Sequence, residues 1–138
     1  MTTVPVEDLG RLALFADVPA DEIAAIARSC DSESFGEGQW IIRAGDDRSA
    51  LYMIVDGEAT IVIDGEDRRV LSKGSFFGEI SALLDEPASA SVVVRSPLSC
   101  LTVPSDEVED FLLAHPLVMF RMLRAEARRL QTASAWRT

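Results

Sequence analysis

The sequence predicts a mainly β fold with flanking α-helices. The expected core is an antiparallel β-roll (a double-sheet jelly roll) of about eight strands, with N-terminal helices before it and two C-terminal helices after it. Two observations predict this architecture: the hydrophobic period is close to two from 32 to 104 and helical on either side, and seven of the eight glycines lie in this middle section, as short strands with tight turns require. With 138 residues, 48% of them apolar, the chain suffices for one domain, 1–138, with its own core.

Residues 1–31 are predicted to form the N-terminal helices. The stretch "VPVEDLGRLALF" places Leu9 and Leu12 at helical spacing. The stretch "PADEIAAIARSC" begins with two acidic residues, which favour a helix N-terminus, and puts Ile23 and Ile26 on one face. Both segments therefore have the pattern of short amphipathic helices.

Residues 32–104 are predicted to form the roll. In "ALYMIVDGEATIVIDGED" the side chains alternate with the period of a strand. The dipeptides Asp56-Gly57 and Asp64-Gly65 follow each other at a spacing of eight residues, and Asp-Gly is a common turn pair in β-hairpins. This pattern predicts a ladder of hairpins.

Residues 105–138 are predicted to form the two C-terminal helices. The first should end at His115-Pro116, because the residue before a proline disfavours helix. The last, from about 117 to 135, carries an apolar stripe, made of Phe120, Leu123, Ala127 and Leu130. An apolar stripe of this kind can be covered by a partner, so a homodimer through the last helix is one expectation.

Charge and hydropathy exclude two kinds of partner. The net charge is −10, and an acidic body argues against nucleic-acid binding. The last eighteen residues hold five arginines against one acid, which we interpret as a solvated helix face. No apolar run approaches the ~20 residues of a membrane span, and the N-terminus lacks the order of a secretory signal. We expect a cytoplasmic protein with no membrane insertion.

Catalysis is not predicted. Metal-dependent enzymes of the cupin type share a double-sheet roll, but their metal needs two or three imidazoles and this chain has one histidine, His115. No nucleophile elbow, P-loop or dinucleotide fingerprint is present. Cys30 and Cys100 lack the spacing of a zinc or redox site. We therefore expect a binding module with no catalytic residues, no metal and no cofactor.

The segment "FFGEISALLDEPASASVVV" is the best candidate for a binding site. Gly78 allows close approach of a ligand, and a short helix from Glu79 would present the free N–H groups of Ile80, Ser81 and Ala82 to an anion such as phosphate. A carboxylate at Glu79 would be repelled by that anion unless it accepts a hydrogen bond from a neighbouring hydroxyl, such as a ribose 2′-OH. The alternative is that Glu79 only caps its own helix.

Several motifs in order resemble the cyclic nucleotide-binding domain family of kinase regulatory subunits, catabolite-activator-type regulators and gated channels. They are "FADVPADEIAAIA", "IIRAGD", "LYMIVDGEATI", "VLSKGSFFGEISALL" and "HPLVMFRMLRAEARRL", and together they cover essentially the whole chain. The resemblance implies a regulatory sensor with a phosphate-binding cassette over residues 76–92. Its ligand would be cAMP in preference to cGMP, and its output would pass to an effector protein or fused domain that the sequence does not identify.

The resemblance also implies roles for individual residues. Glu79 would bind the ribose hydroxyl, the backbone from Gly78 to Ala82 would bind phosphate and sugar, and Ser89 and Ala90 would bind the exocyclic oxygens.

The base would lie over the apolar strands, where the candidates are Val62, Val70 and Leu71, although ordinary core packing explains these three equally well. Trp136 is the candidate lid over the base, with packing on the roll or fraying at the terminus as the alternatives.

Ala88 departs from the family pattern. The family has arginine after the cassette proline, whereas "PASAS" has alanine. Losing a bidentate arginine should weaken phosphate binding by roughly 2–4 kcal/mol, on the order of 30- to 1000-fold in affinity. Either the domain is naturally degenerate and acts as a ligand-independent interaction module, or an arginine was replaced by engineering. We favour the second, because Glu79, Ser89 and Ala90 still fit the cradle.

Overall fold

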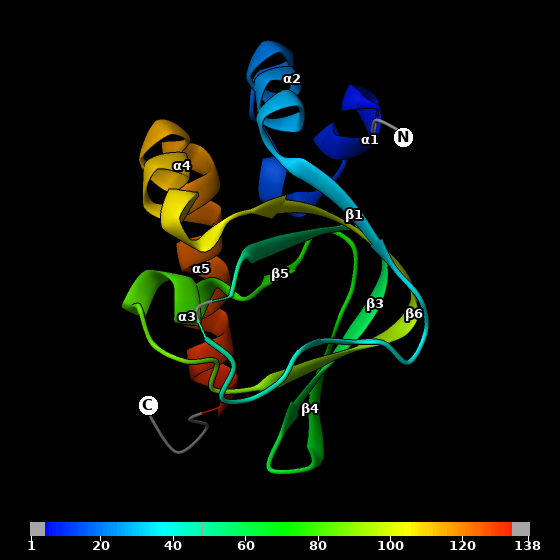
Figure 1. Cartoon of the computed structure of the whole chain (residues 1–138). Coiled ribbons are helices and arrows are strands. Elements are labelled where there is room, and N and C mark those ends of the chain that lie inside the picture. Colours follow the sequence, from blue (N-terminus) through cyan, green and yellow to red (C-terminus); the bar gives the residue numbers. More distant parts are fainter. Residues whose placement is uncertain (1–4, 48, 134–138) are drawn as a thin grey trace.

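The computed structural model describes residues 5–47 and 49–133. The helices in order are α1 (Val6–Gly10), η1 (Ala13–Phe15), α2 (Ala20–Ser29), α3 (Glu79–Leu84), η2 (Ser105–Glu107), α4 (Val108–Ala114) and α5 (Pro116–Ala133). The strands are β1 (Asp31–Phe35), β2 (Trp40–Ile42), β3 (Leu51–Ile63), β4 (Glu66–Leu71), β5 (Phe76–Phe77) and β6 (Ser91–Val103). The predicted order of helices, roll and helices is therefore confirmed (Figure 1).

The roll is built around two long strands, β3 and β6, which pair with each other along most of their length. β4 and β5 pair with β3, while β1 and β2 pair with β6, and all pairs are antiparallel. The described residues thus form six strands, roughly consistent with the expected eight or so. The difference arises because β3 and β6, of 13 residues each, pass through register shifts and serve both halves of the roll, where the sequence pattern suggested separate short strands.

The two Asp-Gly pairs behave differently. Asp64 and Gly65 have φ of 54° and 78° and form the two-residue hairpin between β3 and β4, as predicted. Asp56 and Gly57 form no hairpin, because β3 continues through them. A Cβ on Gly57 would lie 2.1 Å from the carbonyl oxygen of Pro97, so this glycine is needed for the close approach of β6 at the irregular point of the ladder.

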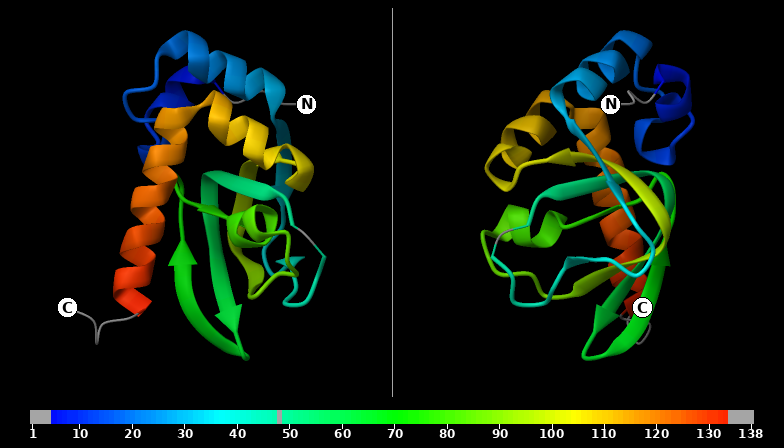
Figure 2. Two further views of the ribbon diagram at one scale, coloured as in Figure 1. Left: turned by 90° about the vertical axis from the view of Figure 1, so that its left-hand side faces the viewer. Right: turned by 45° about the vertical axis from the view of Figure 1, so that its right-hand side comes forward.

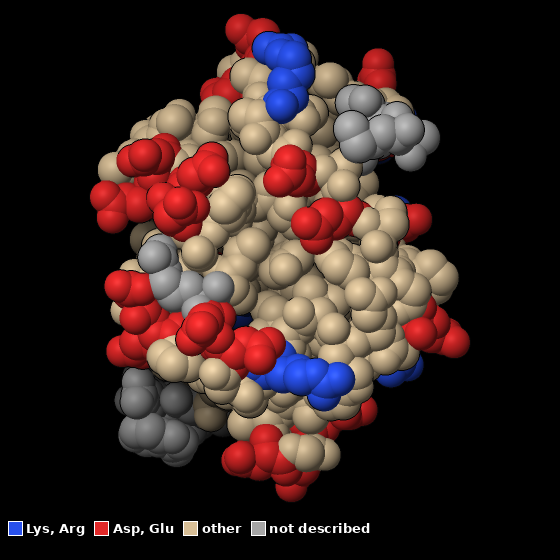
Figure 3. Space-filling view, viewed as in Figure 1, with Lys and Arg blue, Asp and Glu red and all other residues tan. Residues whose placement is uncertain are grey.

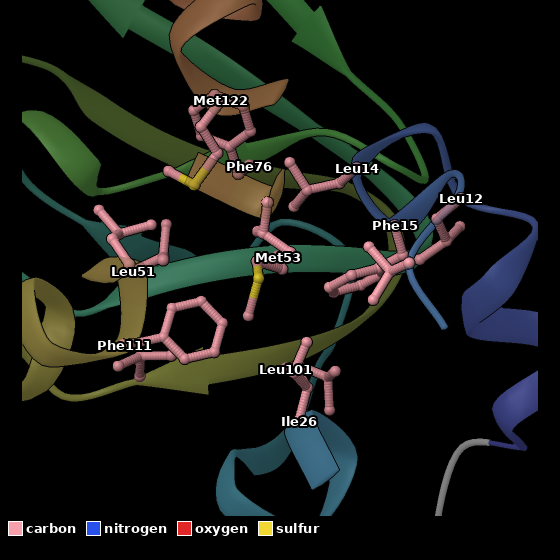
Figure 4. Packing of buried hydrophobic residues seen from close by; sticks show 14 of the residues in the cluster. Leu12, Leu14, Phe15, Ile26, Leu51, Met53, Phe76, Leu101, Phe111 and Met122 are labelled. Carbon is pink, nitrogen blue, oxygen red and sulfur yellow. The ribbon is translucent and has the colours of Figure 1, made fainter. Parts of the chain in front are cut away.

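Two apolar clusters stabilise the fold. The helical cluster joins the N-terminal helices, α4 and α5 to one end of the roll, and Figure 4 shows Phe15, Met53, Phe76 and Met122 among its members. The interior cluster fills the roll itself, and its buried members are Ile42, Ile54, Ala59, Leu71, Phe77, Ala88, Val92, Val94, Leu98 and Cys100. The candidate site lies where these two clusters meet, since Phe76 belongs to the first and Phe77 to the second.

Helix α5 runs along the side of the roll (Figure 2). α4 ends at Ala114 and α5 begins at Pro116, as the His115-Pro116 pair predicts. The imidazole Nδ1 of His115 lies 2.8 Å from a carboxylate oxygen of Glu22, which ties this junction to α2. In the part of the chain described, no helix has both the length and the apolar character that a membrane crossing requires.

Candidate functional site

The chain enters the candidate site at Gly78, between β5 and α3. Gly78 has φ of +85°, a conformation that L residues with a side chain rarely adopt. A Cβ there would lie 2.1 Å from the carbonyl oxygen of Ala50 and 3.1 Å from the hydroxyl of Ser49. The sequence suggested that this glycine admits a ligand, but its first requirement is the close packing of α3 against the loop before β3.

Two serines fix α3 in place. The hydroxyl of Ser81 accepts a hydrogen bond from the N–H of Ser49 (3.1 Å) and donates one to the carbonyl of Glu86. The hydroxyl of Ser49 donates to the carbonyl of Gly78 (3.0 Å). The Ser81 side chain is thus committed within the protein, so only its backbone could serve an anion.

Among the other residues of α3, Ala82 is buried and its N–H donates to the carbonyl of Gly78 (3.4 Å), whereas the side chain of Ile80 is exposed. The N–H groups of Ile80 and Ser81 belong to the first turn, where a helix offers no internal acceptor. These two amides are therefore the ones suited to an external anion.

Glu79 is buried, with 3% of its surface exposed. Its carboxylate lies 3.4 Å from Nη1 of Arg129 on α5. Burial, together with a hydrogen bond to the carboxyl group of Glu126, raises the pKa of Glu79 to about 8, although the nearby Arg129 favours the charged form. Glu79 therefore exchanges a proton near neutral pH and shares its surroundings with a second acid and a base.

Arg129 fastens α5 onto the corner between β5 and α3. Its guanidinium donates to Glu126 (3.1 Å), to the hydroxyl of Ser75 (2.9 Å) and to the carbonyl of Phe76 (2.9 Å), and it lies 4.2 Å from the centre of the Phe76 ring. Interpreting all the C-terminal arginines as a solvated face was wrong for this one. The i, i+3 pair of Glu126 and Arg129 was the available sequence signal, but nothing in the sequence paired it with Glu79.

The second half of the cassette is held by the backbone of Ala88 and by the hydroxyl of Ser91. The N–H of Ala88 donates to the carbonyl of Asp46 and its carbonyl accepts from the N–H of Gly45, both at 2.8 Å. The hydroxyl of Ser91 accepts from the N–H of Ala44 (2.9 Å). Ala88 is 9% exposed, and its methyl group belongs to the interior cluster.

Ser89 is exposed and Ala90 is half-buried. Within the described chain, the Ser89 hydroxyl makes no hydrogen bond, which leaves it available to a ligand.

The three predicted base-contacting residues do not share one face. Leu71 lies in the interior cluster with Ala88, whereas Val62 and Val70 lie outside it and Val70 is 44% exposed. The cause is the alternation of side chains in a strand: Val70 and Leu71 are neighbours on β4 and must point to opposite sides. Ile61, which packs against the interior cluster, was missed.

A bulge between Ile61 and Val62 shifts the register of β3 against β4. Val62 pairs with Ser91 across β6, so it does lie beside the end of the cassette. Trp136, the candidate lid, is outside the described residues.

The potential metal ligands and the two cysteines do not form a further reactive site among the described residues. No three His, Cys, Asp or Glu side chains gather into a metal site within 5–47 and 49–133. Cys30 and Cys100 are free thiols, and burial raises the pKa of Cys30 to about 11 and that of Cys100 to about 12, so both stay protonated and unreactive.

Comparisons with known proteins bear on this site. A family model described as "Cyclic nucleotide-binding domain" matches residues 32–115. The cGMP-dependent protein kinase of Plasmodium berghei is 37% identical over 102 residues, covering 74% of this chain and 12% of the kinase. Glutaminase 2 of Bradyrhizobium diazoefficiens is 33% identical over 132 residues, covering 92% of this chain and 21% of the glutaminase. The Catabolite Activator Protein of Thermus thermophilus has a similar solved structure, with a TM-score of 0.77 and 26% identity over 89% of this chain and 60% of that one.

The chain thus spans about an eighth and about a fifth of the length of these two curated relatives. The kinase and glutaminase activities belong to those longer proteins. The region matched by the family model contains every strand of the roll except the first residue of β1, and it also contains the α3 cassette and α4. The chain belongs to the cyclic nucleotide-binding domain family, a family of regulatory ligand-binding domains.

Proposed function

We propose that this chain is a regulatory domain that binds a cyclic purine nucleotide in the cassette 76–92, with cAMP preferred to cGMP. The observation that carries the proposal is the buried carboxyl group of Glu79, held directly after the left-handed Gly78 at the start of α3. The phosphate would bind the N–H groups of Ile80 and Ser81, and the ribose 2′-OH would donate to Glu79.

Glu79 also supplies a link between ligand and conformation. A ribose hydroxyl that donates to Glu79 enters the network in which Arg129 holds α5 against the β5–α3 corner. Since the ligand and α5 share this one carboxyl group, binding changes how tightly α5 is held. We therefore propose α5 as the mobile element through which the nucleotide signals, by differential contacts in two positions of the helix.

The base would lie against the interior cluster at Leu71 and Ile61, with Val62 beside the end of the cassette. Val70 contributes little to this proposal because it points away from that cluster. A lid from Trp136 remains part of the proposal and can be tested by its fluorescence.

Ala88 sets the affinity. Its backbone is bonded to residues 45 and 46 and its methyl is buried, so the cassette keeps its shape without the family's arginine. What is missing is a bidentate cation for the phosphate, and we propose a working but weakened sensor, in which the arginine was replaced by engineering or recent change.

Calorimetric titration with cAMP tests this. Ala88→Arg should bind on the order of 30- to 1000-fold more tightly than the parent chain. The control is Arg95→Ala, which removes an exposed arginine paired with Glu58 on the surface of the roll and should leave the affinity unchanged. No gain from Ala88→Arg would contradict the proposal.

Ser89 is the residue that could discriminate between cAMP and cGMP. Its free hydroxyl could accept a hydrogen bond from the exocyclic amine of guanine, but a single exposed hydroxyl gives only about 0.5–1.5 kcal/mol. We therefore propose that cGMP is not preferred. A preference of cGMP over cAMP that disappears in Ser89→Ala would overturn this part and assign the guanine contact to Ser89.

A second candidate role, a protein-interaction module, is favoured by the outer face of α5. Phe120, Leu123 and Leu130 are 49%, 63% and 57% exposed, and with Ala127 they follow the alternating four- and three-residue spacing of a coiled-coil seam. We propose that this seam forms a homodimer, which sedimentation of the chain and of Leu123→Glu would test. We also propose that residues 1–138 form a single domain, that the protein is cytoplasmic, and that its output passes to an effector protein or a fused domain.

A further inference from the structure

A pocket of about 310 Å³ lies between α5 and the part of the roll that connects β4 to β5. It is enclosed by α5, by η1 and by the connection between β4 and β5, and its lining residues are Ala13, Leu14, Lys73, Gly74, Ser75, Phe76, Arg121, Arg124, Ala125 and Arg128. Leu14 and Phe76, which line its apolar side, are seen near each other in Figure 4, and Figure 2 (left) shows α5 standing beside β4.

The charge of this pocket is opposite to that of the molecule. Its lining includes four cationic side chains and no carboxylate among the described residues. The chain as a whole carries −10, and the face seen in Figure 3 is predominantly acidic. A concave site lined by one sign of charge attracts a ligand of the opposite sign, so this arrangement favours an anion.

The four cationic side chains of the pocket differ in the contacts that they already make within the protein. Arg121 is anchored by the carbonyl of Ala16 (2.9 Å) and by Asp17 (3.0 Å), and Arg124 stacks 5.0 Å from the centre of the Phe120 ring. Lys73 and Arg128 are exposed and form no ion pair with any described residue. Lys73 belongs to the roll and Arg128 to α5, so an anion between them would bridge the two.

We propose that this pocket binds a small phosphate-bearing polyanion, through Lys73 on one side and Arg124 and Arg128 on the other. Its volume is at the lower end of the range for small-ligand sites, about 300–1,000 Å³, which suits a compact ligand with two or three phosphates. The pocket shares only Phe76 with the cassette, and none of its lining residues belongs to α3 or to the second half of the cassette. The bound anion holds α5 against the roll, in the position in which Arg129 contacts Glu79.

Inorganic pyrophosphate is the probe. The full chain, with no cyclic nucleotide present, is titrated calorimetrically at about 0.15 M ionic strength, where distant exposed charges are screened, and the titration is repeated with sulfate at matched ionic strength. We expect one saturable pyrophosphate site per chain. At the same concentration, the occupancy of this site by sulfate should be at least about tenfold lower. Lys73→Gln combined with Arg128→Gln should weaken binding by about tenfold or more, because both charge-assisted contacts are lost.

The matched control is Arg68→Gln combined with Arg95→Gln. It removes two exposed arginines that pair with Glu66 and Glu58 elsewhere on the roll, so it lowers the net charge equally. It should change the affinity by less than about twofold, because exposed distant charges are screened. Circular dichroism confirms that each double variant is folded, and Arg124→Gln provides a second, single-site variant.

Absence of saturable binding would overturn the proposal, as would an equal loss of affinity in the two double variants. Undiminished binding in the absence of Lys73 and Arg128 would show that these two residues do not hold the anion and would overturn it too. So would a single-stranded oligonucleotide that binds while pyrophosphate does not. None of these results depends on whether the cassette binds cAMP, so the two proposals fail independently.

Discussion

The two limbs of the cassette are held in different ways. In the first limb, residues 78–82, side chains make the decisive contacts: Ser81 and Ser49 lock α3, and Arg129 reaches from α5 to Glu79. In the second limb, residues 88–91, the backbone of Ala88 bonds to Gly45 and Asp46, the hydroxyl of Ser91 accepts from the N–H of Ala44, and no charged side chain is present. The first limb therefore connects the site to a helix, whereas the second connects it only to a loop of the roll.

In the proposed function, this difference separates the affinity for the ligand from the link to α5. Under that proposal, an arginine at position 88 would add a contact to the phosphate from the second limb. The Glu79 network contacts α5 directly. A chain that lacks the arginine can accordingly keep its conformational link while binding its ligand weakly.

The largest expected effect on stability comes from Gly78, at the start of the first limb. Gly78→Ala places a Cβ 2.1 Å from the carbonyl oxygen of Ala50 at a φ of +85°, so α3 and the loop before β3 must separate. We expect a loss of about 3 kcal/mol or more in the free energy of unfolding, measured with denaturant. The control is Gly65→Ala, which has φ of +78° but no atom within 4 Å of the added Cβ and should lose only about 1–2 kcal/mol. Equal losses would show that α3 is not locked as described.

A smaller loss is expected when the tie to α5 is removed. Arg129→Met keeps an apolar stem over Phe76 but leaves Glu79 without its cation and Ser75 without its donor. We expect the free energy of unfolding to fall by about 1–3 kcal/mol, since the pair is mostly buried. Arg124→Met, on the same helix but without a carboxylate partner among the described residues, serves as the control. If both variants lose the same stability, the Glu79–Arg129 contact is not what holds α5.

The protonation of Glu79 gives a third, smaller effect. Its pKa rises from 4.5 to about 8 in the folded chain, so between these values the folded state binds more protons than the unfolded state. The free energy of unfolding should therefore decrease as pH rises through this interval, by an amount that Arg129 moderates. Glu79→Gln should flatten that slope, while Glu37→Gln, at a glutamate in the turn between β1 and β2, should not. A slope unchanged in Glu79→Gln would assign the titration to another group.

The sequence predicts the roll and its helices well where one local signal decides. The Asp64-Gly65 hairpin follows from turn chemistry, and the end of α4 follows from Pro116. The same reasoning misplaces Asp56-Gly57, because the close approach of Pro97 that requires Gly57 comes from a strand some forty residues later.

The site divides in the same way. The motif around Glu79 predicts a buried acid after a glycine, but its partner Arg129 is fifty residues away and has no local signature. Strand alternation alone separates Val70 from Leu71, but which of them faces the interior depends on the register of β4 against β3, and the bulge between Ile61 and Val62 shifts that register. The local pattern of residues does not predict contacts between distant segments, because these contacts depend on how the segments pack.

The most direct test of the central claim is a double-mutant cycle between Glu79 and the ribose hydroxyl, measured by calorimetry in the Ala88→Arg background so that binding is tight. cAMP and 2′-deoxy-cAMP are titrated into this chain and into the same chain carrying Glu79→Gln. If Glu79 accepts the 2′-OH, deoxygenation should weaken binding by about tenfold or more in the presence of Glu79 and by much less in its absence. An equal loss in both chains would contradict the account.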